Sequence, residues 1–497
     1  MKTEFDGRPL RLVFLAKILS CCGAIFLCIP VVNAQPTRQE VVDSMHRSVD
    51  FFREHASAGG GYIFQLSANL KKREGEGVVG PTTAWMEPPA TPSVGRAYLI
   101  AYQLCGDQTL LAAAKEAAHA LVRGQLESGG WDTKIEFDLK DRKGYAYRVD
   151  TEVLKNKKVR NTTTFDDDKS QSAITFLMRL DQALGFEDEA VHEATQYALD
   201  SSLKAQYPNG AWPQKFDGTA QPSKSKVQRA SLPETWSREF PAKKYSNYYT
   251  LNDSTINDLI AMMLDAWEIY DDPRYLQSAL RGGDFLLLAQ LPEPQPGWAQ
   301  QYDQDMHPAW ARKFEPPAIT GGESQGVMQT LMMLYRRTAE HKNSERFLQP
   351  IEPAIAYFRR SLLSDGRLAR FYELKTNRPL FFTTTYQLTY SSDDMPTHYG
   401  FIVGSKLDRL EKELNRCRNT PIDELWKPRK IKPAKSSEGL DKRVTDIIRQ
   451  LDERGAWVEP GRLRYHGEDD PTDRVIRSQT FIGNLNTFAQ WLSANPA

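Results

Sequence analysis

The sequence predicts an all-α protein, an α/α toroid, which is an incomplete or complete α/α barrel of about six helical-hairpin units with long functional loops and few short strands. Three observations predict this fold. Apolar residues recur with helical period, strand-like runs are sparse, and one pattern at the ends of helices returns along the chain. With 26% charged and 40% hydrophobic residues, the chain can bury a substantial core.

The returning pattern is a Gln near the end of a helix, followed by a Gly and an aromatic residue. Its clearest copies are Gln125 to Gly130-Trp131, Gln206 to Gly210-Ala211-Trp212, and Gln290 to Gly297-Trp298. Copies are spaced roughly 70 to 90 residues apart, too far for a small solenoid repeat. For most copies we expect a structural role, in which the Gly ends the helix and the aromatic ring fills the core.

Between these marks the apolar residues follow one helix face, as in residues 94–104 and 256–267. Each unit therefore reads as two helices, and closing the units on themselves places the loops on one face. Strand candidates are short, such as Leu380 to Thr385. Long irregular stretches at 137–169, 221–251 and 291–323 interrupt the repeat, and we expect the chemistry there.

The first 34 residues predict a signal peptide. A basic stretch precedes an apolar run over residues 12–32, which ends in the small-residue pattern Val32-Asn33-Ala34. We therefore expect an exported protein, periplasmic or secreted, with no membrane span after cleavage. A membrane anchor is the alternative, although Lys17 interrupts the run, and Cys21 leaves a lipoprotein open.

The remaining chain divides into a catalytic helical body at 35–424, a linker-like segment at 425–441 rich in Lys, Pro and Ser, and a C-terminal helical unit at 442–497 packed on the body. The net charge is zero, so no global field attracts a nucleic acid, and we expect a monomer. Only Cys105 and Cys417 follow residue 34, which excludes a disulfide framework. The common nucleotide, zinc-protease and serine-hydrolase motifs are absent.

Two carboxylate clusters precede predicted helices: Asp166-Asp167-Asp168 and Asn252-Asp253-Ser254. Such residues favour helix starts because they accept backbone N–H bonds, so capping is one interpretation. Three adjacent carboxylates exceed that need and repel one another, and a hard divalent cation such as Ca²⁺ would relieve the repulsion. Both clusters should fall on the same side of a toroid, where they could share an ion.

Two further segments carry cations. His307 to Glu315 contains Arg312 and Lys313, which could neutralise substrate carboxylates, although Arg312 and Glu315 could also form a common helix-surface pair. Ala369 to Pro379 contains Arg370 and Arg378.

Taken together and in order, these segments resemble the polysaccharide lyase family 10 pectate lyases, from about Gln125 to about Pro379. The stretches that carry the resemblance are Gln125 with Gly129-Gly130-Trp131, Trp212-Pro213-Gln214, Leu251-Asn252-Asp253, Trp298 with Gln301-Tyr302-Asp303, Pro308-Ala309-Trp310-Ala311-Arg312, Glu323-Ser324, and Ala369-Arg370-Phe371-Tyr372-Glu373 with Thr376-Asn377-Arg378-Pro379.

The resemblance implies that Asp166, Asp167 and Asp253 hold calcium and substrate, and that Arg312 acts as the base. It also implies substrate contacts, which we expect from Asn252, Asp303, Lys313, Arg370, Arg378, Trp212 and Trp298. There are departures. Asp167 replaces an asparagine of the family, Ser254 a second aspartate and Ala211 a glycine, and a downstream double-arginine segment appears only as Asp394 to Phe401.

The implied activity is calcium-assisted β-elimination of polygalacturonate, which leaves 4,5-unsaturated oligogalacturonides. Arginine is an awkward base because its pKa exceeds about 12, so a small neutral fraction would have to act, raised by a neighbouring cation such as Lys313. One alternative is a glycoside hydrolase that pairs Asp166 or Asp167 with Asp253. Another is an exported sugar-binding protein, which would have no need of Arg312.

Overall fold

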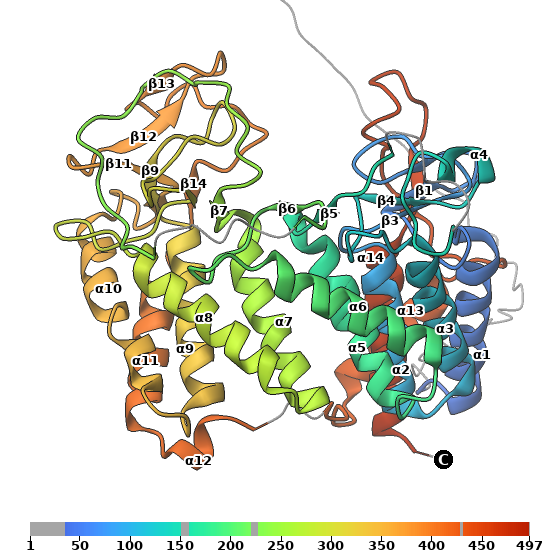
Figure 1. Ribbon diagram of the computed structural model, residues 1–497. Helices are drawn as coiled ribbons and strands as arrows, with labels where there is room; N and C mark the ends of the chain where they lie inside the picture. Colours follow the sequence, from blue (N-terminus) through green and yellow to red (C-terminus); the bar gives the residue numbers. More distant parts are fainter. Residues whose placement is uncertain (1–34, 151–158, 220–226, 428–430, 497) are drawn as a thin grey trace, which may run out of the picture. The chain divides into compact units, whose positions relative to one another are not determined.

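The computed structural model describes residues 35–150, 159–219, 227–427 and 431–496 (Figure 1). The predicted signal peptide lies outside these residues. From Pro36 onward, the described residues form one compact unit. None of the helices in the described segments is long and apolar enough to cross a membrane. The unit is mostly helical with few short strands, as the sequence predicts.

The helices are α1 (Arg38–Phe51), α2 (Thr91–Cys105), α3 (Gln108–Gly124), α4 (Leu139–Arg142), α5 (Lys169–Ala183), α6 (Glu189–Ala205), α7 (Thr255–Tyr270), α8 (Pro273–Ala289), α9 (Glu323–Thr338), α10 (Ile351–Arg360), α11 (Leu407–Asn419), α12 (Ile422–Leu425), α13 (Glu438–Gln450) and α14 (Ser478–Ala494). Short π or 3₁₀ turns are η1 (Phe52–Ala56), η2 (Asp166–Asp168), η3 (Asn252–Ser254) and η4 (Ser344–Leu348).

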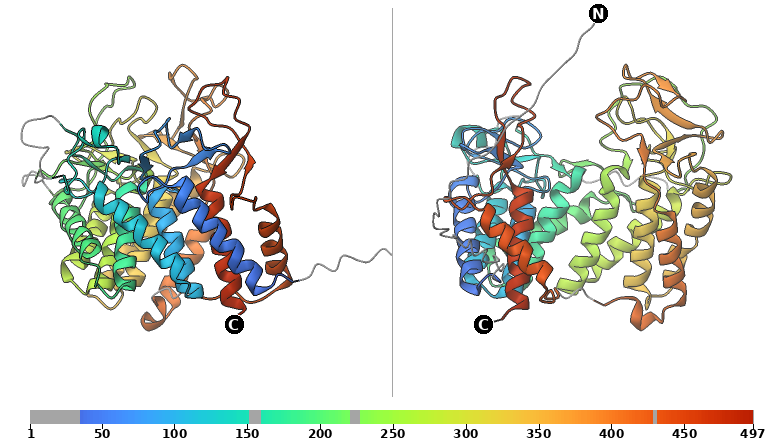
Figure 2. Two further views of the ribbon diagram at one scale, coloured as in Figure 1. Left: turned by 90° about the vertical axis from the view of Figure 1, so that its right-hand side faces the viewer. Right: turned by 180° about the vertical axis from the view of Figure 1, so that it is seen from behind.

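The longer helices lie in two layers (Figures 1 and 2). In the inner layer α14, α2, α5, α7, α9 and α11 pack in that order, each against the next. The outer layer supplies hairpin partners, because α3 packs on α2, α6 on α5, α8 on α7 and α10 on α11. Within the described residues no extensive packing joins α11 back to α14, so the series is an incomplete α/α toroid.

The turns that connect the two helices of these hairpins share one feature, an aspartate that caps the outer helix. Asp107, Asp188 and Asp272 each precede an outer helix, and each side chain accepts a hydrogen bond from a backbone N–H of the first turn. These caps satisfy donors that have no partner within the helix. Pro273 adds a preset φ at the first position of α8.

The Gln residues of the repeated pattern tie neighbouring units together. The Gln125 amide donates to the Gly129 carbonyl at 2.9 Å and to the Ala194 carbonyl of α6 at 2.8 Å. Gln206 does the same with Gly210 and with Ser278 of α8, both at 2.9 Å. Each amide therefore closes its own loop and binds the next outer helix, which explains the spacing of the pattern.

The strands are β1 (Gln65–Ser67), β2 (Arg73–Glu74), β3 (Thr83–Trp85), β4 (Lys134–Glu136), β5 (Thr163–Thr164), β6 (Lys215–Phe216), β7 (Tyr249–Thr250), β8 (Gln301–Tyr302), β9 (Ala318–Thr320), β10 (Leu368–Ala369), β11 (Phe371–Glu373), β12 (Pro379–Phe382), β13 (Leu388–Thr389), β14 (Ile402–Val403), β15 (Glu459–Pro460) and β16 (Arg474–Arg477). β12 overlaps the predicted strand segment, Leu380 to Thr385.

Most of these strands belong to the repeat. β16, β3, β5, β7 and β9 each lead into an inner helix. Each pairs antiparallel with a strand that follows an outer-layer helix, as in Thr163↔Phe216 for β5 and β6 and Tyr249↔Tyr302 for β7 and β8. Five helix starts are thereby held by short ladders at the same end of the inner layer.

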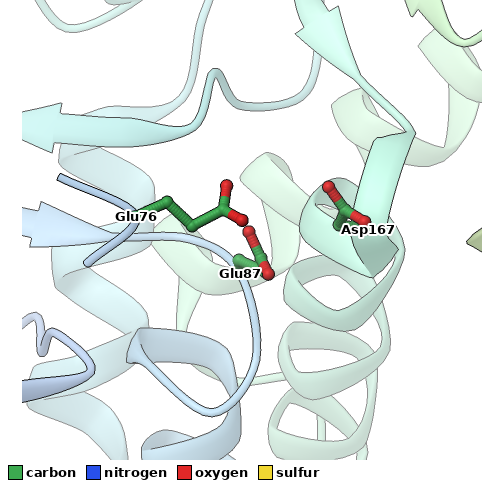
Figure 3. Close-up of side chains that lie close together, drawn as sticks. All are labelled: Glu76, Glu87 and Asp167. Atoms are coloured by element: carbon green, nitrogen blue, oxygen red, sulfur yellow. The ribbon is translucent and has the colours of Figure 1, made fainter. Parts of the chain in front are cut away.

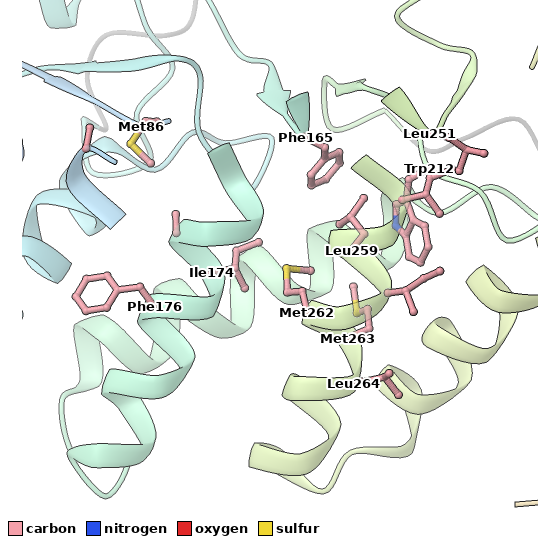
Figure 4. Packing of buried hydrophobic residues seen from close by; sticks show 14 of the residues in the cluster. Met86, Phe165, Ile174, Phe176, Trp212, Leu251, Leu259, Met262, Met263 and Leu264 are labelled. Carbon is pink, nitrogen blue, oxygen red and sulfur yellow. The ribbon is translucent and has the colours of Figure 1, made fainter. Parts of the chain in front are cut away.

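Beneath these helix starts the core is closely packed (Figure 4). Phe165 and Leu251, the residues just before η2 and η3, are fully buried, as are Ile174 of α5 and Leu259 of α7. Side chains that project outward from η2 and η3 therefore stand on a rigid base, since interiors of this kind are as dense as organic crystals.

Candidate active site

The two carboxylate clusters form by the same backbone route. β5 runs into η2 and then α5, and β7 runs into η3 and then α7. Each turn holds two consecutive left-handed residues: Asp167 (φ 51°) with Asp168 (φ 57°), and Asp253 (φ 48°) with Ser254 (φ 61°). Neither α5 nor α7 receives a side-chain cap from the residue before it, so the capping interpretation is wrong at both positions.

Left-handed residues other than glycine cost about 1–2 kcal/mol each. Such strain persists where the surrounding fold imposes it, and it concentrates at functional sites. Here it turns the carboxylates away from the helix N-termini and toward one another.

Asp166, Asp167 and Asp253 meet at the contact between η2 and η3. Their carboxylate oxygens lie within 4.8 Å of one another. Asp166 accepts a hydrogen bond from the Gln214 amide at 2.8 Å. Asp253 accepts one from the amide of Asn252. The fold thus brings together the three residues that the sequence proposes as metal ligands.

This crowding makes the ionised forms unfavourable. Burial raises the pKa of Asp253 to about 7, and repulsion from Asp167 and Asp166 adds to the shift. Burial and repulsion from Asp167 also raise the pKa of Asp166. Oxygen ligands that are close together and electrostatically frustrated suit a hard divalent cation such as Ca²⁺, which would relieve the repulsion.

A second acidic group adjoins the first through Asp167 (Figure 3). Glu76, Glu87 and Asp167 also offer oxygens within 4.8 Å of one another. Here, however, a buried lysine already supplies a positive charge, because the Lys169 ammonium lies 2.8 Å from Asp167 and 3.1 Å from Glu87. The sequence analysis identified neither Lys169 nor the two glutamates as site residues.

Arg312 stands on the other side of Asp253. One guanidinium nitrogen, Nη2, lies 3.7 Å from the Asp253 carboxylate and 2.6 Å from that of Glu315. Arg312 does pair with Glu315, but not on a helix surface as the sequence suggested, because residues 311–317 form no helix and Glu315 is 1% exposed.

Glu315 is a fully used acceptor. It also receives hydrogen bonds from the Arg312 backbone N–H at 3.0 Å, the Gln300 amide at 2.9 Å and the Tyr399 hydroxyl at 3.0 Å. Burial is the largest single effect and lowers the pKa of Arg312, but the hydrogen bond with Glu315 and the charges of Glu315, Tyr399 and Asp253 together outweigh burial and raise that pKa above its usual value. Glu315 therefore both orients the guanidinium and keeps it charged in the resting protein.

Three predicted substrate contacts are wrong because the side chains are buried. Trp212 and Trp298 have no exposed surface, and their indole N–H groups donate to the carbonyls of Ser202 and Leu286 in the preceding helices. They are core residues of the repeat. Asn252 is 4% exposed; its amide donates to Asp253 and accepts from Gln300, so it holds Asp253 in place.

The other four predicted substrate residues, Arg370, Lys313, Asp303 and Arg378, differ in their contacts. Arg370 pairs with Glu323 at 2.8 Å and lies over the Tyr399 ring, which itself contacts Glu315. Lys313 is exposed beside Arg312. Asp303 accepts hydrogen bonds from backbone N–H groups of its own turn, and Arg378 lies 3.4 Å over the Tyr390 ring.

Residues 125–368 match the family model described as pectic acid lyase. The match assigns this part of the chain to the pectic acid lyase family. The protein is accordingly a polysaccharide lyase, as the sequence resemblance implies. The match includes Asp166, Asp167, Asp253 and Arg312, and ends just before Arg370. A search of curated proteins finds no match.

Similar solved structures include the family 10 polysaccharide lyase from Cellvibrio cellulosa, at 19% identity, covering 66% of this chain and 97% of that chain with a TM-score of 0.45. A mutant of that enzyme in complex with trigalacturonic acid is 19% identical and has a TM-score of 0.44, covering 66% of this chain and 98% of that chain. An alpha-mannanase from Bacteroides thetaiotaomicron is 10% identical and has a TM-score of 0.39, covering 91% of this chain and 95% of that chain. The family assignment of this pectic acid lyase rests on the matched residues.

Proposed function

We propose that this pectic acid lyase is an exported pectate lyase that cleaves polygalacturonate by calcium-assisted β-elimination, with Arg312 as the base. The observation that carries the proposal is the position of Asp253. Its carboxylate belongs to the acidic cluster and also lies 3.7 Å from Arg312 Nη2. A sugar carboxylate held at the cluster would therefore bring its neighbouring C5 proton close to Arg312.

Asp166, Asp167 and Asp253 would hold the calcium ion, since they are hard oxygen donors without a His or Cys among them. A bound calcium ion supplies Lewis-acid polarisation of the uronate carboxylate, which makes the C5 proton more acidic. The Lys169 ammonium lies 2.8 Å from Asp167 and orients that carboxylate.

In the elimination, the C5–H electron pair becomes the C4–C5 double bond, the C4–O bond breaks, and the departing oxygen takes a proton. Nη2 of a neutral Arg312 would accept the C5 proton. Glu315 makes this neutral form rarer, but it also stabilises the guanidinium that results from proton transfer. With a rare but strong base, we expect the rate to rise toward alkaline pH.

Arg370 is the best-placed second arginine for a substrate carboxylate. Its pKa is raised because Glu323, Tyr399 and Asp253 outweigh the effect of burial, so it stays charged. Its neighbours Tyr399 and Glu323 fix its guanidinium, which adds a positive charge to the site. Asp303 and Arg378 stay as proposed substrate contacts further out.

The decisive experiment is an assay of the purified protein on polygalacturonate. A lyase releases products that absorb ultraviolet light because of the new C4–C5 double bond, and a glycoside hydrolase releases products that do not. We expect absorbance to rise with calcium, to stop with excess chelator and to recover when calcium is added back. Reducing ends without new absorbance would establish the hydrolase instead, with Asp253 and Asp166 as its carboxylate pair.

Export is tested separately. We expect the protein from expressing cells to be found outside the cytoplasm with Gln35 as its N-terminal residue, because the pattern at residues 32–34 is that of a cleavage site. An uncleaved chain would contradict this part of the proposal and leave the chemistry unaffected.

A further inference from the structure

A cavity of about 380 Å³ lies beside Arg312, outside the acidic cluster. Its walls come from the loop at residues 238–240, from the segment that ends in Lys313, and from the β12–β13 hairpin. The side chains that matter are Arg238, Phe240, Trp310, Lys313, Phe382 and Tyr386. The volume is within the usual range for small-ligand sites.

The walls are fixed by contacts among themselves. The Trp310 indole N–H donates to the Ser237 carbonyl at 2.8 Å, which anchors the loop. The Phe240 and Phe382 rings lie 5.8 and 6.2 Å from the Trp310 ring, one on the loop and one on β12. Arg238 pairs with Glu373 of β11, which is buried. The cavity is thus built and does not depend on one surface side chain.

The cavity lies near the reaction centre, and the buried Phe314 ring contacts residues of both. The Arg312 guanidinium lies 5.4 Å from the Phe314 ring, and the Tyr386 ring lies 5.8 Å from the same ring. Lys313 follows Arg312 in the chain and lines the cavity. A polymer with one sugar at Arg312 would therefore reach the cavity with a sugar further along.

The charge and the apolar surface of the cavity identify the ligand class. Lys313 is exposed, and its ammonium lies 3.5 Å over the Tyr386 ring. Among the described residues the Lys313 ammonium contacts this ring, which leaves its N–H donors available to a carboxylate of a ligand. Aromatic rings such as Phe240, which is 40% exposed, offer flat apolar faces to the C–H face of a sugar ring.

We propose that this cavity is a subsite for a further uronate residue of the same polygalacturonate chain, with Lys313 binding its carboxylate and Phe240 packing on its ring. The proposal rests on the proposed function, because it takes the substrate to be an acidic polysaccharide. It assigns to Lys313 a task separate from the elimination, and it gives the loop at residues 238–240 a role in chain-length preference.

The test measures kcat/KM for galacturonate oligomers of increasing length. The wild-type enzyme should show a rise at the length that first reaches the cavity. In Lys313→Ala and in Phe240→Ala this rise should fall about tenfold, equivalent to about 1.4 kcal/mol of binding. Lys204→Ala, at an exposed lysine on α6, is the matched control and should keep the rise. A defect in the chemistry would lower all lengths equally and leave the length dependence intact.

Direct binding of the longest oligomer, measured by calorimetry with excess chelator present, separates the two proposals. Weaker binding in Lys313→Ala and Phe240→Ala than in Lys204→Ala supports the subsite even if the wild-type protein releases no unsaturated product. If both variants keep the length dependence and the wild-type affinity, the subsite is wrong whatever the reaction.

Discussion

Replacing Arg312 by lysine distinguishes a base from a charge that only attracts substrate. The lysine ammonium would stand about where the Arg312 guanidinium carbon stands, and so about 1.3 Å short of Nη2, which is the length of one C–N bond. Nη2 is the nitrogen that contacts Glu315 at 2.6 Å and lies 3.7 Å from Asp253. A proton acceptor misplaced by about 1 Å can cost about 10²-fold in rate.

If Arg312 only attracts a carboxylate, the same shift matters much less. At an effective dielectric constant of about 20, lengthening a charge separation from about 4 to about 5.3 Å costs about 1 kcal/mol, or about fivefold. Arg312 is 41% exposed, so solvent would reduce even this value. We therefore expect Arg312→Lys to lose about 10²-fold in kcat, nearly as much as Arg312→Ala.

The assay follows ultraviolet absorbance on polygalacturonate at saturating calcium and separates kcat from KM, with a thermal melt for each variant to check folding. Arg378→Lys is the control, because Arg378 is exposed and contacts the Tyr390 ring, and its replacement should chiefly raise KM. Arg312→Lys with a kcat within tenfold of wild type would refute the arginine base.

Three further outcomes follow from the site. The folded-state pKa of Asp253 is raised to about 7 from an unfolded value near 3.8, so the stability of the calcium-free protein falls as pH rises between about 4 and 7. Because calcium binds the ionised carboxylate, it should bind about tenfold more tightly at pH 8 than at pH 6. An equal Kd at both pH values in titration calorimetry would contradict this. Glu315→Gln should lower kcat about 10²-fold by releasing Arg312, whereas Glu74→Gln, at a buried carboxylate in the β1–β2 sheet, should cost only stability in a thermal melt. Ser254→Gly should raise the free energy of unfolding by about 1 kcal/mol because glycine adopts a positive φ without strain, and an unchanged urea midpoint would count against strain at η3.

The repeat was readable from the sequence because its causes are local. Gln125 and Gln206 have fixed partners four residues downstream, and the helices between the copies bury one face each. The strands that lead into the inner helices were not readable. β5 and β7 span two residues each, too short for an alternating pattern, and only pairing across the fold defines them.

Within the site, the sequence located the charged residues better than it assigned their tasks. Trp298 lies beside candidate site residues in the chain, yet its indole belongs to the core, because the Gly-aromatic pattern serves the repeat. Glu315 was visible three residues after Arg312, but that spacing suggested a helix where the chain makes a turn. Glu87 and Tyr399 reach the site from distant segments, and nothing in their local sequence marks them.

The aspartate clusters show how a correct position can have a different physical cause. Asp and Asn before a helix usually accept hydrogen bonds from the first turn, and a carboxylate so engaged would face its own helix. In η2 and η3 two successive left-handed residues rotate Asp167 and Asp253 out of that geometry, and η2 then packs on η3. Because both turns carry the same distortion, their carboxylates converge, which neither turn could achieve alone. Without a cation, the backbone strain and the carboxylate repulsion both raise the free energy of the site. One bound cation would offset the repulsion, which is the larger of the two costs.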